Sequence, residues 1–470
     1  MVATGRQSLF WKEDTNLRRM KLLSLLVSLV FIISVLASCG KPTGTENKTS
    51  ESTTTTTEKT TEETTGKDSE PTPAKSVKIT ILNSKGEIQA PMEEVAKIFT
   101  QENPNITVEV IACPQGTSPF EKVSSLYASN AAPSISILDG GDIPKFTDKA
   151  VDLTGEKWVN DTPFVADCTI DGKVVCFPVV VEGCGLIYNK AVLSKAGVDP
   201  ASIKTQKDLE DALKKIQDTG VAGCIIGGMD WSLGNHLSVI AWANKSKNAA
   251  DVKKFLDDIK AGVVDVAADK DFNNLVASFD ILKAYNKAKE DPLSVDSNKA
   301  AEVIAKGEAG FLFQGNWTWP EMEKFNADPE NFGMIPLPIS NDASDIANTG
   351  IQAGPTKFAI VDKEQNDADQ QAASKEFLNW LVYSESGNEA IVTTANCIMA
   401  FKNVQLLPND PLGKSIAAAI KNDATLVFTG NLCPSDHWKS VGAEWQKYLA
   451  GKSDKAALAK GIMDYWTSSN

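Results

Sequence analysis

The feature that most constrains the fold is a regular alternation of strand and helix patterns that begins at Val77. Hydrophobic residues alternate with polar ones where a strand is expected, and they recur at helical spacing where an amphipathic helix is expected. The pattern predicts strands at residues 77–82, 106–111 and 134–138, and helices at 91–102 and 120–128. This order is typical of an α/β domain with a largely parallel sheet flanked by helices.

The same alternation returns further along the chain. Thr205 and Asp208 have the spacing of a capping box with Asp in the acidic position, so they predict the start of a helix. The other predicted elements are a strand at 184–188, a helix from Ala191, a strand at 221–226 and a helix at 372–381. The part of the chain after residue 76 is far longer than a typical domain of about 100–150 residues. We therefore expect two α/β lobes.

Residues 1–38 have the composition of a secretory signal. Lys21 precedes an apolar run at 22–36, which is shorter than the roughly 20 residues that span a bilayer. The run ends in Leu36-Ala37-Ser38-Cys39, which resembles the lipobox of bacterial lipoproteins. This resemblance implies cleavage before Cys39 and a lipid on its thiol. The alternative is an ordinary signal or an uncleaved anchor with a chance cysteine. Met20 is a better start than Met1, because residues of mixed charge precede it.

Residues 39–76 are rich in Thr, Ser and Glu and contain almost no hydrophobic side chain. Such a segment cannot bury enough apolar surface to fold, so we expect a disordered tether. Its root-mean-square reach would be roughly 30–40 Å, and its full extension about 120 Å. The predicted location is the extracellular face of the cell membrane, with the protein held there by its N-terminal lipid.

Charge and cysteine content exclude several classes of function. The net charge of -14 argues against nucleic acid, which binds basic surfaces. The chain has only two histidines and no C-x-x-C pair, so we expect neither a metal site nor a cofactor. Cys168 and Cys176 flank Asp171-Gly172, a hairpin signal. A three-residue loop would bring the two cysteines to disulfide range and a two-residue loop would not; buried free thiols are the other possibility.

Six segments in order resemble extracellular solute-binding proteins of ABC importers, in the family that takes up maltose and other oligosaccharides. The matching segments are residues 102–109, 132–139, 177–190, 306–317, 333–338 and 373–380. The resemblance implies a two-lobed periplasmic-binding-protein fold in which the chain crosses between lobes three times. Lobe 1 would comprise 77–182 and 350–395, and lobe 2 would comprise 183–349 and 396–470. Crossings are expected near 182–185, 349–355 and 394–400.

Glycines at the first two expected crossings, Gly183, Gly185, Gly350 and Gly354, allow two interpretations. They could supply the backbone freedom of a hinge, or they could serve simple turn geometry.

Three tryptophans are predicted to contact a ligand. A sugar presents flat patches of C–H groups, which aromatic rings cover, together with hydroxyl groups, which carboxylates and amides bind. Trp231 follows the strand predicted at 221–226, where ligands of open α/β sheets bind. The resemblance places Trp317 and Trp438 at stacking positions. Asn316, directly before Trp317, and Asp436, two residues before Trp438, are further candidates for ligand contact. Trp319, Trp380, Trp445 and Trp466 lie in predicted helices and are expected to pack in the core.

Polar candidates lie in the loops that follow the predicted strands. Ser84, Lys85 and Glu87 come directly after the first strand, and Asp139 follows the third. Glu182 lies between two small or apolar neighbours at the first crossing, where a charge needs a partner to be buried. Solvated loop charges are the alternative for each of these residues.

The predicted function is a lipid-anchored receptor that binds an oligosaccharide in the cleft between its lobes and delivers it to the permease subunits of an ABC importer. The receptor is expected to be a monomer without enzymatic activity. Two alternatives stay open: a binder of a polyamine or peptide, and a cell-surface glycosidase that uses a pair of carboxylates. No nucleophile elbow, zinc-protease motif or phosphate loop occurs in the sequence.

Overall fold

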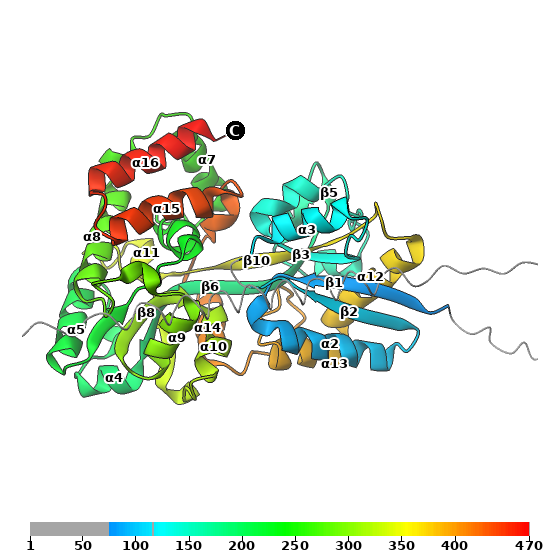
Figure 1. Ribbon diagram of the computed structural model, residues 1–470, viewed down its shortest axis with the longest axis horizontal. Coiled ribbons are helices and arrows are strands. Elements are labelled where there is room, and N and C mark those ends of the chain that lie inside the picture. Colours follow the sequence, from blue (N-terminus) through cyan, green and yellow to red (C-terminus); the bar gives the residue numbers. More distant parts are fainter. Residues whose placement is uncertain (1–74, 115–116, 470) are drawn as a thin grey trace, which may run out of the picture. The chain divides into compact units, whose positions relative to one another are not determined.

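The computed structural model describes residues 75–114 and 117–469 (Figure 1). The predicted signal, Cys39 and most of the predicted tether lie outside the described residues, so they stay predictions. None of the described helices is long and apolar enough to cross a membrane.

The first part of the described chain follows the predicted alternation closely. Its elements are β1 (Val77–Asn83), α2 (Gln89–Glu102), β2 (Ile106–Ala112), α3 (Pro119–Ala128) and β3 (Ile135–Asp139). Strand β1 pairs in parallel with both β2 and β3. The side chain of Ser118 caps α3, and α2 buries Val95 and Phe99 against the sheet. Because parallel strands end at one edge of a sheet, the loops after β1 and β3 lie near each other.

Two long strands connect the two ends of the sheet (Figure 1). They are β6 (Phe177–Asn189) and β10 (Ile351–Val361). The strand order is β2-β1-β3-β10-β6-β8-β7, with β8 at Ala309–Gly315 and β7 at Ala222–Ile225. Strands β7 and β8 are parallel, whereas the β3–β10, β10–β6 and β6–β8 pairs are antiparallel. Parallel pairing therefore occurs toward each end of the sheet, and β6 and β10 join the ends.

Strand β6 is longer than the predicted strand at 184–188. Its first half pairs with β10 as far as Cys184, and from Cys184 onward it pairs with β8. Pro178 and the glycines near Glu182 hide this strand in the sequence, because proline and glycine normally weaken a strand. The extended backbone is imposed by neighbours on both sides, which are distant in the sequence.

The remaining elements cover the sheet or pack beyond it. Before β10 they are β4 (Thr169–Ile170), β5 (Lys173–Val174), α4 (Lys190–Lys195), α5 (Gln206–Asp218), α6 (Ile240–Ala243), α7 (Ala249–Lys260), α8 (Lys270–Ala284), α9 (Ser297–Ala305), α10 (Trp319–Glu323), β9 (Phe332–Ile335) and α11 (Ile346–Thr349). After β10 they are α12 (Ala368–Tyr383), α13 (Glu385–Glu389), α14 (Pro411–Lys421), β11 (Thr425–Leu426), α15 (His437–Leu449) and α16 (Lys455–Ser468).

The hydrophobic residues form two clusters, one centred on β1–β3 with α2 and α12, the other on α5–α8 with α15 and α16. Phe99 of α2 packs edge-on against Phe377 of α12, with ring centroids 5.1 Å apart. In the second cluster Phe279 meets Trp445 at the same distance, 5.1 Å. The prediction that Trp319, Trp380, Trp445 and Trp466 pack in the core is confirmed, since each is buried. The predicted residue boundaries of the lobes stay a prediction.

The hairpin predicted at Asp171-Gly172 is present and has a two-residue loop. Both loop residues have positive φ, and Ile170 pairs with Lys173. This register places Cys168 opposite Val175, whose N–H donates to the Cys168 carbonyl oxygen at 2.9 Å. Cys176 is therefore one position away from the residue opposite Cys168. All seven cysteines of the described residues are buried free thiols, in agreement with that alternative.

Candidate functional site

A cavity of about 520 Å³ lies where the loops after β1 and β3 face the segments around Trp231 and Trp438. Its volume falls within the range of small-molecule sites. Nine of the ten predicted binding residues line it: Ser84, Lys85, Glu87, Asp139, Glu182, Trp231, Trp317, Asp436 and Trp438. The structure thus brings together side chains that are far apart in the sequence. That they bind a ligand stays a prediction.

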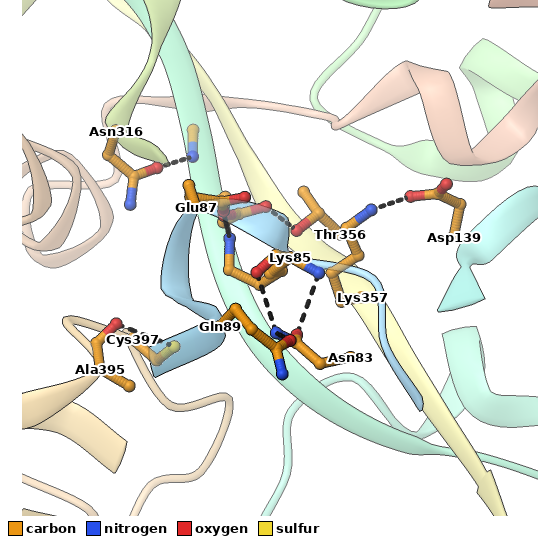
Figure 2. Close-up of polar contacts among 12 residues, drawn as sticks. Asn83, Lys85, Glu87, Gln89, Asp139, Asn316, Thr356, Lys357, Ala395 and Cys397 are labelled. Atoms are coloured by element: carbon orange, nitrogen blue, oxygen red, sulfur yellow. Dashed lines mark hydrogen bonds and ion pairs between the residues drawn. The ribbon is translucent and has the colours of Figure 1, made fainter. Parts of the chain in front are cut away.

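Lys85 is the centre of a buried ionic cluster (Figure 2), and the three side chains of the cluster line this cavity. Its ammonium lies 2.7 Å from Glu87 Oε1 and also forms an ion pair with Glu182. All three side chains are about 5–6% exposed. The side chain of Asn83 shapes the turn: its Oδ1 accepts the Lys85 N–H and its Nδ2 donates to the Lys85 carbonyl, both at 3.0 Å.

The three charges stabilise one another in their ionised forms. Burial by itself lowers the pKa of Lys85, but the carboxylates of Glu182 and Glu87 raise it above its ordinary value. Burial by itself raises the pKa of Glu182, but Lys85 and the hydroxyl of Thr356, which donates to Glu182 Oε2, hold it below its ordinary value. A buried charge is tolerated only when it is paired in this way.

A second acidic group lies after β3. Lys357 of β10 pairs across the strands with Asp139 and forms an ion pair with its carboxylate (Figure 2). Asp142 lies 3.7 Å from the ammonium of Lys145. Burial, reinforced by the charge of Asp139, raises the pKa of Asp142 to about 6, although Lys145 opposes this shift. Asp139 is half-exposed to the cavity, whereas Asp142 is largely buried.

Aromatic rings form another wall of the cavity, which we call the aromatic wall: Trp231, His236, Trp317 and Phe428. The imidazole of His236 is central, with its ring centroid 4.8 Å from Trp317, 5.5 Å from Trp231 and 5.8 Å from Phe428. Burial lowers the pKa of His236 to about 4, so its imidazole is neutral at neutral pH. The wall thus offers flat, uncharged faces.

The ring of Trp317 packs over Gly315, two positions before it. A Cβ on Gly315 would lie 2.2 Å from atoms of the Trp317 ring, so the ring would have to move if residue 315 carried one. Trp317 follows β8, and Trp231 lies immediately before the π-helix Ser232–Leu237 that also carries His236.

Three predicted residues have surroundings that the sequence did not indicate. Asn316 does not line the cavity: its Oδ1 accepts the backbone N–H of Gly183 at 3.0 Å, so it supports β6 (Figure 2). Asp436 lies exposed at the edge of the cavity and accepts the Tyr465 hydroxyl at 2.8 Å. The buried hydroxyl of Ser84 has no partner within the described chain.

Sequence reasoning missed other residues of the cavity wall: Phe120, Asp142, His236, Thr356, Lys357 and Phe428. Lys357 carried a usable signal, because it is the one charged residue of β10 and a buried charge needs a partner. For Phe428 and Phe120 no signal distinguishes them from ordinary core aromatics. Within residues 75–114 and 117–469, no group of three or more His, Cys, Asp or Glu side chains could hold a metal ion.

This chain belongs to the family of bacterial extracellular solute-binding proteins, whose family model matches residues 94–425. The family resemblance found in the sequence is thereby confirmed, while the lipoprotein part of it lies outside what the comparison covers. The model that matches most of the chain describes solute-binding receptors, not enzymes.

Relatives and solved structures agree with this assignment. An uncharacterised ABC transporter extracellular-binding protein of Pyrococcus horikoshii is 24% identical, over 68% of this chain and 70% of its own. A multiple sugar-binding protein of Streptococcus mutans is 22% identical, over 84% of this chain and 91% of its own. The structure of the solute-binding protein RafE in complex with raffinose superposes with a TM-score of 0.70 at 15% identity, covering 83% of this chain and 99% of that one. The predicted two-lobed α/β fold is confirmed.

Proposed function

We propose that this protein is an extracellular receptor that binds an oligosaccharide in the cavity described above and delivers it to an ABC importer. The observation that carries the proposal is the pairing of two unlike surfaces in one cavity. The aromatic wall presents flat apolar faces, and the groups around Lys85, Asp139 and Glu182 present fixed carboxylate and ammonium groups. A sugar ring has apolar C–H faces and a rim of hydroxyl groups, so it matches both surfaces.

The names of relatives support a sugar as the solute. The Streptococcus mutans relative is named for several sugars, and the RafE structure holds raffinose. The Pyrococcus relative is named as part of an ABC transporter, which supports transfer to a permease. We propose further that Cys39 carries the lipid and that residues 39–76 tether the receptor at the cell surface as a monomer.

The structure contains one observation that favours a glycosidase instead. The raised pKa of Asp142, about 6, resembles the property that a general acid requires. Against this role, Asp142 lies beside Lys145, and Glu87 and Glu182 are committed to Lys85. Because these carboxylates are held by lysines, we propose a receptor without catalytic activity.

The test is a thermal-shift screen of the mature protein against mono- and oligosaccharides, amino acids, peptides and polyamines. We expect a rise in Tm with at least one oligosaccharide, because a ligand that binds only the folded state stabilises it. The same samples are then analysed by chromatography for hydrolysis products. A shift only with a polyamine, peptide or amino acid would refute the sugar, and turnover of a glycoside would refute the receptor.

A further inference from the structure

We propose that the cavity selects uncharged sugars and rejects sugars that carry a carboxylate or a phosphate group. This inference rests on the proposed sugar-receptor function and narrows the class of ligand. Its main support is that three of the four lysines lining the cavity are already paired with carboxylates.

Each buried or half-buried lysine of the cavity wall has a carboxylate partner. Lys85 lies between Glu87 and Glu182, and Lys357 is paired with Asp139. Lys145, which is 41% exposed, lies 3.7 Å from Asp142. An incoming carboxylate or phosphate would therefore have to compete with an existing partner for each of these cations.

The fourth lysine of the wall, Lys439, forms no ion pair within the described chain, but it lies on the exposed surface of α15. Solvent and salt screen a charge in that position. Lys439 would therefore attract an anionic ligand only weakly compared with a buried cation.

The balance of charge is also negative. Six carboxylates line the cavity against four lysines: Glu87, Glu121, Asp139, Asp142, Glu182 and Asp436 against Lys85, Lys145, Lys357 and Lys439. The neutral imidazole of His236 adds no compensating positive charge. An anionic group that entered this cavity would lose its hydration and meet a net repulsion.

Hydrogen-bonding capacity leads to the same conclusion. An ionised carboxylate only accepts hydrogen bonds, and the carboxylate of Asp139 is 49% exposed toward the cavity. A sugar hydroxyl can donate to such an oxygen, whereas a carboxylate or phosphate on the ligand cannot. Asp139 therefore favours ligand groups that donate hydrogen bonds over anionic groups.

The first experiment compares matched ligands by isothermal titration calorimetry. Raffinose, maltotriose and cellotriose are each tested beside the derivative in which primary hydroxymethyl groups have been oxidised to carboxylates. For a sugar that binds, we expect the oxidised form to bind at least about tenfold more weakly. Equal or tighter binding of the oxidised form would overturn this inference alone. Binding of neither form for all three sugars would instead count against the sugar-receptor function and the inference with it.

The second experiment uses the Asp139→Asn variant, which removes one carboxylate from the cavity and releases Lys357. We expect the discrimination against the oxidised sugar to fall by at least about threefold. Asp369→Asn is the matched control, because Asp369 pairs with Lys75 on the exposed surface away from the cavity. Unchanged discrimination in Asp139→Asn would overturn the assignment of the repulsion to this carboxylate. If the variant does not fold, the parent is measured from low to high salt: the discrimination must shrink as salt screens the charges.

Discussion

Individual side chains of the cavity divide into those that hold it together and those that keep surface open to it. Lys85, Glu87 and Glu182 are almost fully buried and satisfy one another, so their first role is structural. Trp231, Trp317 and Asp139 retain exposed surface toward the cavity and are available for contact. Substitutions at the two kinds of position should therefore have different effects on stability and affinity.

The first group is tested by Glu182→Gln, which leaves Lys85 with a single carboxylate in a buried setting. We expect the free energy of unfolding to fall by about 3–5 kcal/mol, since removal of one partner leaves a buried charge poorly compensated. Urea denaturation measures the change. Asp369→Asn is the control: it breaks an ion pair whose side chains are 73% and 51% exposed, and we expect no measurable effect. Similar small changes in both variants would contradict the structural role of the cluster.

The second group is tested by Trp317→Ala, which removes a ring of the aromatic wall. For the sugar found in the screen, we expect affinity to fall about tenfold or more through loss of stacking and apolar contact. The fold should stay intact because Trp317 is only partly buried. Calorimetry gives the affinity and circular dichroism the fold. Leu407→Ala removes a 55% exposed side chain outside the cavity and should leave affinity unchanged; unchanged affinity in Trp317→Ala would remove this residue from the site.

Asp142 is expected to make stability depend on pH. Its pKa is raised from an ordinary value of 3.8 to about 6 in the folded protein, chiefly by burial. The folded state therefore binds this proton more tightly than the unfolded state, and stability is lost as the pH rises from about 4 to about 6. The side chain of the Asp142→Asn variant cannot ionise. The free energy of unfolding of the variant should therefore rise relative to that of the parent across this pH range, by at most about 3 kcal/mol. Urea unfolding at pH 4 to 8 measures it, and a difference that does not vary with pH would be the contrary result.

At the scale of elements, β6 and β10 determine the geometry of the site. They place Glu182 beside Thr356, and Lys357 beside Asp139 of β3. None of the four glycines at the first two expected crossings has a positive φ, so a left-handed turn does not explain them: Gly183, Gly185, Gly350 and Gly354. Gly183 and Gly185 are instead required by close approach, because a Cβ at each would lie under 3 Å from a carbonyl oxygen of a neighbouring segment.

Gly183→Ala tests this requirement. The new methyl group would lie 2.7 Å from the carbonyl oxygen of Gln352 and 2.5 Å from Ile416 Cδ1. We expect a loss of about 1–3 kcal/mol in the free energy of unfolding, which is typical of overpacking. Gly155→Ala is the matched control, because no heavy atom lies within 4 Å of its Cβ position and its φ is not positive. Equal melting temperatures for the two variants would argue against close packing at Gly183.

At the scale of the whole molecule, the proposed anchor would keep the cavity close to the cell surface. A receptor that binds a solute outside the cell is useful only if it stays close to its permease, and a tether of residues 39–76 would provide this. Among the residues that the structure describes, no helix is long and apolar enough to cross a membrane.

Cys39→Ser should therefore release the receptor from the producing bacterium. We expect the parent in the membrane fraction and the variant in the medium, since a single-acyl or unlipidated protein is not stably held. Fractionation followed by immunoblotting measures the distribution, and the mass of the N-terminal peptide identifies the lipid. Ser50→Ala in the predicted tether is the control and should stay with the membrane. An N-terminal peptide of the parent whose mass shows no lipid on Cys39 would refute the anchor.

The sequence by itself determined most helices and strands of the first half and the position of the candidate cavity at the ends of β1 and β3. Hydrophobic periodicity and caps such as Thr205 are local properties, so a local pattern predicts them well. The loops after parallel strands meet at one edge, so Lys85 and Asp139 could be assigned to the site without coordinates.

Only the tertiary structure decided which partners those residues have. It paired Lys85 with Glu182 across nearly a hundred residues, directed Asn316 to the backbone of Gly183, and placed His236 among three aromatic rings. Such contacts depend on the register and approach of segments that are distant in the chain, and no local pattern encodes them. The same reason explains why β6 was predicted too short: its part before Cys184 pairs with β10, a strand that is distant in the sequence.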